Sequence, residues 1–371
     1  MDQEAKHLFE PAGDFQCLHE FLPAARAKLS DNIWSYLVGA TETETTLRRN
    51  RLALDSLALR PRVCVDVSKV SLGTTLFGRK LRLPVILAPV GSLESFDPGG
   101  AATAGRAASA FGVPIMVSSV TAPGLEEAAA AAPGPKIFQL YVRGDNAWID
   151  DVAKRAVDSG YDAFAITVDT AAYSRRERDI AGRFVKPWRA VATGQGYQAS
   201  FTWDNVKHFK DKHSIPLILK GIGTGEDAAL CCEHGVDGVY VSNHGGRQLD
   251  HGRGSMDILP EVMEAVRGRA KVIVDGSICR GTDIVKAIAL GADAVAMGRM
   301  YCYAMAAGGE AGVVKMLELL EHEFGVSMAL AGARSLGELN PRYVFRDAPP
   351  VARPHAHSAF PLLQTTPEYR G

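Results

Sequence analysis

Eight short apolar segments recur between residues 83 and 299, and a segment with helical character follows each of them. The apolar segments are Leu83–Pro89, Pro114–Ser119, Lys136–Val142, Asp162–Asp169, Leu217–Gly221, Gly238–Asn243, Lys271–Gly276 and Ala294–Arg299. Most are near-continuous runs rich in Val and Ile, which is typical of parallel strands that are buried on both faces. Eight β/α units without a long interruption predict a closed (β/α)8 barrel, the TIM barrel. A doubly wound open sheet is the alternative, and the number of units disfavours it.

Amphipathic stretches between the predicted strands support this interpretation. They are Asn146–Ser159, Trp203–His213, Glu226–His234, Leu259–Val266 and Asp283–Leu290. Several end at a glycine, which is the usual residue just past a helix C-terminus. We therefore expect these stretches to form the outer ring of helices.

The sequence before the barrel predicts an N-terminal helical extension. Residues 14–60 look helical, and residues 61–82 look like a short hairpin around Phe77-Gly78. After the barrel, Ala311–Phe324 has a strong helical pattern. The fold class is therefore α/β, with helices added at the N-terminal side of the barrel.

A proline-rich stretch without periodicity begins at about Asp347. We interpret residues 347–371 as an irregular tail that is disordered or contacts a neighbouring subunit. The remainder, residues 1–346, is predicted to be one domain with a barrel core at about 83–325.

Bulk composition indicates a soluble globular protein and excludes several functions. Apolar residues make up 47% of the chain and charged residues 22%, and the net charge of −1 gives no electrostatic case for nucleic acid or an anionic membrane. No apolar run reaches the length of a membrane helix, and the first residues lack the apolar region of a signal peptide. Six cysteines without a CxxC pair argue against a disulfide scaffold or a structural zinc site. We expect a cytoplasmic enzyme without a metal.

Polar residues and glycines gather at the carboxyl ends of all eight predicted strands. In strand order they are Ala88-Pro89-Val90-Gly91, Ser118-Ser119, Gln139 with Tyr141, Thr167-Val168-Asp169, Lys220-Gly221, Ser242-Asn243-His244-Gly245, Asp275-Gly276-Ser277 and Gly298-Arg299. Polar groups at the interior ends of apolar strands are costly unless they bind something. Because the loops after barrel strands meet at one rim, these residues predict an active site there.

The residue types suggest particular chemistry. The last two strand ends, which include Ser277 and Arg299, are where barrels often bind a phosphate. His244 with Arg247 three residues later suggests a base beside an anion clamp, and Asp169 is a candidate for the carboxylate that orients the base. Lys220 lies among apolar neighbours and needs an anionic or accepting partner, although a Schiff-base lysine is also possible at this stage.

The segment Ser242-Asn-His-Gly-Gly-Arg-Gln248 resembles the active-site signature of the FMN-dependent 2-hydroxy acid oxidase and dehydrogenase family. The resemblance covers roughly residues 20–340. Its other segments are Tyr36 before Gly39-Ala40, Ala88-Pro89, Phe138-Gln-Leu-Tyr141, Thr167-Val-Asp169, Arg175-Arg176, Leu219-Lys-Gly221, Asp275-Gly276, Arg280-Gly-Thr-Asp283 and Gly298-Arg299. Each tripeptide is weak evidence, but together, in order and at the strand ends, they are highly specific.

The resemblance implies that the protein oxidises an L-2-hydroxy acid to the 2-oxo acid with FMN as cofactor. His244 is then the base that takes a proton from the substrate, and Asp169 stabilises its charged form. Tyr141 steadies charge near the substrate oxygen, and Lys220 lies beside the flavin N1/C2 carbonyl region.

The resemblance also assigns the substrate carboxylate to Arg247, Arg176 and Tyr36, with Tyr141 close to the substrate oxygen. The residues it assigns to the flavin are Pro89, Val90, Gly91, Ser118, Gln139, Thr167, Lys220, Ser242, Asp275, Ser277, Gly298 and Arg299. The electron acceptor is oxygen or another compound. We further expect a homotetramer or a higher homo-oligomer.

Four features depart from the family pattern. Cys279 stands where the family has a phosphate-binding arginine, which predicts weaker FMN retention unless Arg280, Arg299 or backbone amides compensate. The segment between Arg183 and Trp203 is short, which predicts an open site for a bulkier substrate. Val120 replaces a tryptophan that glycolate-oxidising relatives often have, and Gly91 favours a dehydrogenase or a slow oxidase.

Two other hypotheses stay open at this point. A flavin-free barrel could act as an aldolase or lyase with Lys220 as a Schiff base. A degenerate, non-catalytic barrel is the other, and the presence of His244, Arg247 and Asp169 argues against it.

Overall fold

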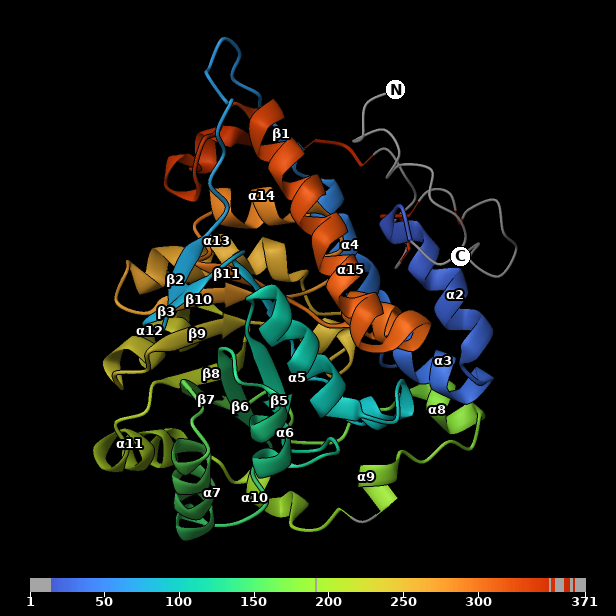
Figure 1. Cartoon of the computed structure of the whole chain (residues 1–371). Helices are drawn as coiled ribbons and strands as arrows, with labels where there is room; N and C mark the ends of the chain where they lie inside the picture. Colours follow the sequence, from blue (N-terminus) through green and yellow to red (C-terminus); the bar gives the residue numbers. More distant parts are fainter. Residues whose placement is uncertain (1–14, 191, 347, 351–356, 361–362, 364–371) are drawn as a thin grey trace.

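The eight predicted strands form a closed, all-parallel barrel in sequential order (Figure 1). The computed structural model describes residues 15–190, 192–346, 348–350, 357–360 and 363. The barrel strands are β4 (Val85–Leu87), β5 (Ile115–Ser118), β6 (Lys136–Leu140), β7 (Ala163–Thr167), β8 (Leu217–Ile222), β9 (Gly238–Val241), β10 (Lys271–Val274) and β11 (Ala294–Met297). The predicted (β/α)8 fold is confirmed, and the open sheet is excluded because β11 pairs with β4.

Most strands end one or two residues before the predicted boundary. The residues beyond each end are the polar and glycine residues of the expected site, among them Asp169, Asn243 and Gly276. Gly276 has a φ of 107°, and the side chains of Asp169 and Asn243 hydrogen-bond to His244 and Gly246 in the turn at the rim. The strands of the barrel are thus apolar, and the polar site residues lie in the loops that follow them.

The barrel interior is filled by side chains of the strands themselves. Ile86, Met116, Ile137, Ile218, Tyr240 and Ile273 form this cluster together with small alanines. At the amino-terminal end of the strands, the hairpin β2 (Thr74–Leu76) and β3 (Arg79–Leu81) closes the barrel with Leu76 and Leu81. The predicted hairpin around Phe77-Gly78 is therefore confirmed, and it leaves only the opposite end open for a ligand.

Helices cover the outside of the barrel as predicted. They are α5 (Gly100–Phe111), α6 (Leu125–Ala131), α7 (Asn146–Asp158), α11 (Trp203–Lys212), α12 (Gly225–Glu233), α13 (Ser255–Val266), α14 (Gly281–Ala289) and α15 (Arg299–Ala331). The last is much longer than expected and bends at Gly308 and Gly309, where the backbone is not helical. Among the described residues, no helix is long and apolar enough to cross a membrane.

The N-terminal extension brings three further helices to the carboxyl ends of the strands. They are α2 (Phe21–Lys28), α3 (Asp31–Val38) and α4 (Thr45–Asp55). α2 packs along α15, and α4 contacts both α13 and the turn at His244–Gly246 (Figure 1). The extension therefore forms one wall of the site and delivers Tyr36 to it.

Most of the predicted tail lies outside the described residues. In the part that the structure describes, Phe360 and Leu363 are buried against the core. The Ser358 hydroxyl donates a hydrogen bond to Asp55 at 3.0 Å. These residues contact the barrel domain of the same chain.

Candidate active site

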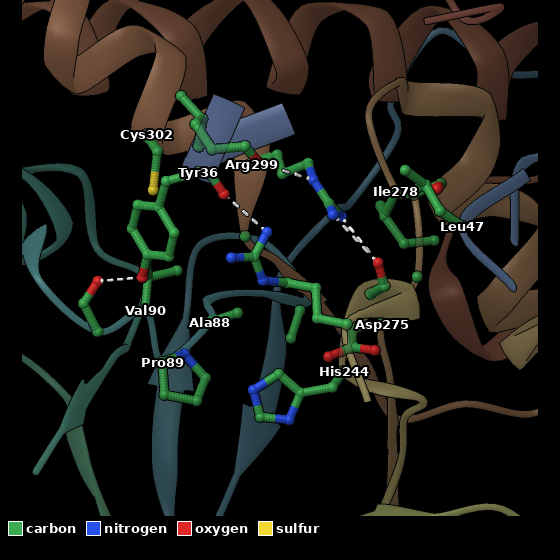
Figure 2. A pocket seen from close by; sticks show the side chains of 18 of the residues that line it. Tyr36, Leu47, Ala88, Pro89, Val90, His244, Asp275, Ile278, Arg299 and Cys302 are labelled. Carbon is green, nitrogen blue, oxygen red and sulfur yellow. Dashed lines mark hydrogen bonds between the residues drawn. The ribbon is translucent and has the colours of Figure 1, made fainter. Parts of the chain in front are cut away.

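A large open cavity lies at the carboxyl ends of the strands (Figure 2), with an empty volume of about 1170 Å³ that includes solvent-open space. The predicted site residues that line it are Tyr36, Pro89, Val90, Gly91, Tyr141, Arg176, Lys220, His244, Arg247, Asp275, Ser277, Gly298 and Arg299. The others, Ser118, Gln139, Thr167, Ser242 and Asp169, lie around this rim, and the first four are buried. The structure thus brings all the predicted site residues to one end of the barrel.

The turn after β9 places three successive residues in the left-handed region of the backbone, which glycine adopts most easily. His244, Gly245 and Gly246 all have positive φ, of 60°, 63° and 76°. A Cβ at Gly246 would lie 2.5 Å from the backbone nitrogen of Leu47 in α4, so only glycine fits this contact. The Asn243 carboxamide oxygen accepts a hydrogen bond from the Gly246 amide at 3.0 Å and fixes the turn. His244 is held in a strained αL conformation, as is common at functional sites.

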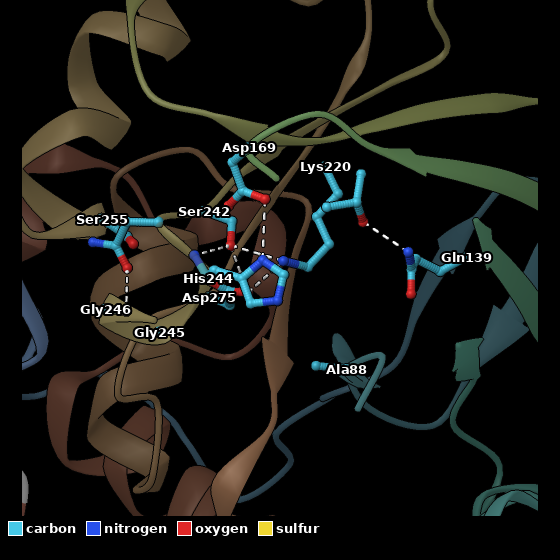
Figure 3. Close-up of polar contacts among 12 residues, drawn as sticks. Ala88, Gln139, Asp169, Lys220, Ser242, His244, Gly245, Gly246, Ser255 and Asp275 are labelled. Atoms are coloured by element: carbon cyan, nitrogen blue, oxygen red, sulfur yellow. Dashed lines mark hydrogen bonds and ion pairs between the residues drawn. The ribbon is translucent and has the colours of Figure 1, made fainter. Parts of the chain in front are cut away.

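His244 lies between Asp169 and Tyr141. Its Nδ1 lies 3.0 Å from Asp169 Oδ1 (Figure 3). Its Nε2 lies 3.1 Å from the Tyr141 hydroxyl. Burial lowers the pKa of His244 below its ordinary 6.5, and Lys220 adds to this, whereas Asp169 opposes it. Burial alone would raise the pKa of Asp169, but His244 and Lys220 outweigh it and the pKa is lowered. The arrangement therefore holds an ionised carboxylate against a neutral imidazole.

Arg247 and Arg176 form a half-buried cationic pair beside Tyr36. The Arg247 guanidinium donates to the backbone carbonyls of Tyr36 and Gly39 at 2.8 and 2.6 Å and lies over the Tyr36 ring. Burial and the charge of Arg176 lower the pKa of Arg247 to about 9. Two like charges close together and partly shielded from water are unfavourable, and an anion that binds between them would relieve this. The pair is therefore a site for a carboxylate.

Two buried phenols face the same cavity. The Tyr36 hydroxyl donates a hydrogen bond to the Gly91 carbonyl at 2.8 Å, and burial raises the pKa of Tyr36 to about 12. Burial also raises the pKa of Tyr141. Both phenols therefore stay protonated, and in this structure Tyr36 donates its proton to Gly91 while the Tyr141 hydroxyl lies 3.1 Å from His244 Nε2.

Deeper in the barrel, Lys220 belongs to a buried polar chain. Its Nζ donates to Ser242 Oγ at 3.0 Å and lies 3.7 Å from Asp275, and the Ser242 hydroxyl donates to Asp275 at 2.9 Å (Figure 3). These partners hold the ammonium in place. The finding weakens the Schiff-base hypothesis, which needs a free amine.

Buried polar atoms in this region are available to FMN. Asp275 Oδ1 and Gln139 Oε1 are buried without a hydrogen-bond partner among the described residues, although Gln139 donates to Thr167 at 2.9 Å. A flavin N–H and a ribityl hydroxyl are donors that would satisfy them. In the part of the chain that the structure describes, no group of His, Cys, Asp or Glu side chains could hold a metal ion. The residues present therefore fit FMN, with Lys220 as the cation for its pyrimidine edge.

The end of the cavity expected to hold the phosphate is formed by the loops after β10 and β11. Ser277 has a φ of 63°, and Arg299 donates to the backbone carbonyls of Leu37, Gly39 and Gly245. Cys279 is buried and lines the cavity. Arg280 does not line it, because its guanidinium pairs with Glu323 at 2.6 Å. Of the groups expected to compensate for Cys279, Arg299 lines the cavity and Arg280 does not, so the structure favours Arg299.

Several lining residues were not predicted from the sequence. His357 and Phe360, from the tail, lie at the phosphate end, and Trp188, from the segment between α8 (Glu177–Ala181) and α10 (Gln195–Ala199), lies at the other. A Cβ at Gly91 would lie 2.9 Å from Val120 Cγ2 and 3.5 Å from Trp188 Nε1. Trp188 therefore lies close to Gly91 and lines the cavity from the segment between Arg183 and Trp203. The sequence around Trp188 has no periodicity, so it did not predict that this indole lines the cavity.

Lys186 is another residue that the sequence did not reveal. Its ammonium is buried over the Tyr36 ring at 4.4 Å, pairs with Asp179 at 2.7 Å and donates to the Tyr173 hydroxyl at 2.8 Å. Burial, with Arg176 and Arg247, lowers its pKa to about 6. Lys186 therefore ties the segment after α8 to the wall beneath the carboxylate site.

Comparison with known proteins agrees with this geometry. The family model for FMN-dependent dehydrogenases matches residues 25–346. Glycolate oxidase 5 of Oryza sativa subsp. japonica is 37% identical over 358 residues, which cover 91% of this chain and 97% of the relative. A solved structure of mandelate oxidase is 37% identical, covers 91% of this chain and 100% of that chain, and has a TM-score of 0.85. A mandelate oxidase mutant solved with an FMN adduct is 39% identical over 88% of this chain and 98% of that one, with a TM-score of 0.81.

Proposed function

Since this chain belongs to the FMN-dependent dehydrogenase family, we propose that it oxidises an L-2-hydroxy acid with an aromatic side chain to the 2-oxo acid. FMN-dependent oxidation of a 2-hydroxy acid is the activity that its relatives establish. When bound, FMN accepts the two electrons that leave C2 of the substrate. The size and chemistry of the substrate side chain are the new part of the proposal.

A second cavity next to the first carries this proposal. Tyr141, Arg176, Trp188 and His244 line both cavities, and the second has an empty volume of about 520 Å³ that opens to solvent. A substrate whose hydroxyl faces His244 and whose carboxylate faces Arg247 would extend its side chain past these shared residues. Glycolate, which has no side chain, would leave the second cavity unused.

The walls of the second cavity favour an aromatic ring. Tyr173 and Trp188 both line it, with ring centroids 6.2 Å apart at an angle of 55°. Aromatic rings pack favourably edge to face or offset at such distances. One solved relative is a mandelate oxidase mutant with (S)-mandelic acid, an aryl 2-hydroxy acid, which supports the same substrate class.

We assign the steps of the reaction to residues as follows. Asp169 accepts a hydrogen bond from the Nδ1–H of His244, so that Nε2 is the base that takes a proton from the substrate. Tyr141 donates a hydrogen bond near the same atom, and Arg247 with Arg176 holds the carboxylate. Lys220 stabilises negative charge at the pyrimidine edge of the reduced cofactor.

The electron acceptor, the location and the assembly belong to the proposal as well. We propose a cytoplasmic homo-oligomer of four or more chains that passes electrons to oxygen or another acceptor. Size measurement in solution tests the assembly. Reoxidation of the reduced flavin with oxygen and then with a quinone tests the acceptor.

The test of the proposed function is an anaerobic substrate panel read by bleaching of the flavin absorbance. Glycolate, L-lactate, L-3-phenyllactate and L-mandelate are compared at equal concentrations. We expect the two aromatic acids to bleach the flavin with at least tenfold higher kcat/KM than glycolate. Faster bleaching by glycolate would contradict the proposed side chain, and no bleaching by any of the four would contradict the proposed reaction.

A further inference from the structure

The second cavity contains a guanidinium that the proposed reaction does not use. Arg143 follows β6 two residues after Tyr141 and lines this cavity together with Thr170, Gln195 and Gln248. The reactive carboxylate already has Arg247 and Arg176 as partners. Arg143 is therefore a surplus cation on the path of the substrate side chain.

Arg143 has no carboxylate partner in the described part of the chain. No ion pair and no hydrogen bond joins its guanidinium to a described residue, and its one aromatic contact is to the Trp188 ring at 6.0 Å. Several other arginines among the described residues are paired with carboxylates, for example Arg82 with Glu321 at 2.7 Å and Arg280 with Glu323 at 2.6 Å. A half-buried, unpaired guanidinium costs free energy that a bound anion would recover.

The electrostatics of the second cavity favour an anion. Its described lining includes the cations Arg143 and Arg176 and no carboxylate. Burial lowers the pKa of Arg143, and the Tyr141 phenol opposes this. The Thr170 hydroxyl is buried without a hydrogen-bond partner among the described residues and can donate to an anion. The cavity therefore offers charge and hydrogen bonds that a purely apolar ring would not use.

We propose that the substrate carries a second anionic group on its aromatic side chain and that Arg143 binds this group. The substrate is then an aryl 2-hydroxy acid with a carboxylate, or a similar anion, at the far side of the ring. Trp188 and Tyr173 contact the ring, and Arg143 determines which rings are accepted. This inference rests on the proposed function, because it assumes that the reactive end of the substrate lies at His244.

The test compares matched substrates with the loaded enzyme and with variants. The substrates are 3- and 4-carboxymandelate against 3- and 4-methylmandelate, which are similar in size but lack the second charge. A hydrogen bond to a charged group contributes about 1.5–3 kcal/mol, so we expect the better carboxy substrate to have about tenfold or more higher kcat/KM. Arg143→Met should abolish this advantage and leave the methyl substrates within about twofold, whereas Arg143→Lys should keep part of it.

Two controls separate substrate binding from a structural role. Arg175→Met removes a largely exposed positive charge near the site, outside the second cavity, and should keep the preference. Calorimetric binding of 4-carboxybenzoylformate and 4-methylbenzoylformate should show the same dependence on Arg143 without turnover. If Arg143→Met lowers kcat/KM equally for both substrate types, Arg143 only supports Trp188 and the inference is wrong.

The remaining outcomes distinguish this inference from the function it rests on. If the methyl substrates are oxidised and neither carboxy substrate has a higher kcat/KM, the role of Arg143 in binding a second anion is wrong, whereas the proposed reaction is not contradicted. No flavin bleaching by any of the four substrates contradicts the proposed aromatic 2-hydroxy acid, and with it the role of Arg143.

Discussion

Asp169 Oδ1 lies 3.0 Å from His244 Nδ1, and this contact determines which nitrogen of His244 is a base. An ionised carboxylate only accepts hydrogen bonds, so Nδ1 carries the proton and Nε2 has the free lone pair. Nε2 lies 3.1 Å from the Tyr141 hydroxyl at the point where the cavities meet. A substrate that occupies either cavity would therefore lie beside this base.

Replacement of His244 by alanine should remove the base and keep the flavin site. A positioned general base contributes about 10²- to 10⁴-fold to a rate, so we expect flavin reduction to slow by that factor. The measurement is single-turnover bleaching in anaerobic stopped flow, with the FMN content of each protein as control. Reduction at the wild-type rate with full FMN content would contradict the role of His244.

The pH profile should report the lowered pKa of His244. Its pKa in the free enzyme lies below 6.5, so the neutral form dominates at neutral pH and kcat/KM should fall on the acid side. Because Asp169 raises the pKa of His244, Asp169→Asn should move this acid limb to lower pH while it also lowers the plateau. Lys186, with a pKa of about 6, titrates in the same range. The pH profile of Lys186→Met shows how much of the acid limb comes from this lysine. A limb that moves to higher pH in Asp169→Asn contradicts the assignment.

The buried ion pair between Arg51 and Asp283 should stabilise the phosphate end of the site. The Arg51 side chain, 3% exposed, contacts Asp283 at 2.9 Å and donates to the Ser277 carbonyl at 3.1 Å. Asp283 also accepts hydrogen bonds from the Cys279 and Arg280 amides at 3.0 Å. Arg51→Met leaves a buried carboxylate unpaired, so we expect a loss of about 3–5 kcal/mol in unfolding free energy and weaker FMN binding.

The sign of the pH dependence checks this prediction. Arg51 holds the pKa of Asp283 below its ordinary 3.8, so the pair contributes stability above about pH 4 and loses it as the pH falls through the lowered pKa. Urea unfolding should therefore show the largest deficit of Arg51→Met at neutral pH and a smaller one in acid. The double variant Arg51→Met/Asp283→Leu should lose less unfolding free energy than Arg51→Met alone. A larger loss in the double variant would count against an unpaired-charge effect.

The sequence predicts the barrel and much of the site because their signals are local. Apolar runs identify the strands, and the residues just after each run, such as His244, must meet at the rim of a closed barrel. The remaining features depend on contacts between distant parts of the chain. The pairing of Arg280 with Glu323, 43 residues away, removes an arginine that the motif seemed to offer to the phosphate. Trp188 and Phe360 come from segments without periodicity, so no pattern placed them at the cavity.

Replacement of Cys279 by arginine should strengthen FMN binding. Cys279 is buried and lines the cavity near Ser277, and burial raises the pKa of its thiol to about 12, so it carries no charge. A second cationic contact to the phosphate is worth about 1.5–3 kcal/mol, which corresponds to at least a tenfold lower Kd. Fluorescence titration of apoprotein with FMN measures this, and Cys279→Ser controls for the loss of the thiol. An unchanged Kd in Cys279→Arg contradicts the prediction.

Gly91 and Val120 should act as a coupled pair at the flavin side of the site. A Cβ at Gly91 would lie 2.9 Å from Val120 Cγ2, and the Gly91 carbonyl accepts the hydrogen bond of Tyr36. Gly91→Ala should therefore overpack this region, lower the unfolding free energy by about 1–3 kcal/mol and weaken FMN binding. Val120→Ala removes the colliding methyl group, so the double variant should recover most of both losses.

Thermal unfolding and FMN titration of the wild type, both single variants and the double variant form a complete cycle. Additive losses would show that Gly91 and Val120 do not compete for space. We expect the double variant to recover most of both losses, because Val120→Ala removes the Cγ2 that a methyl group at position 91 would meet at 2.9 Å.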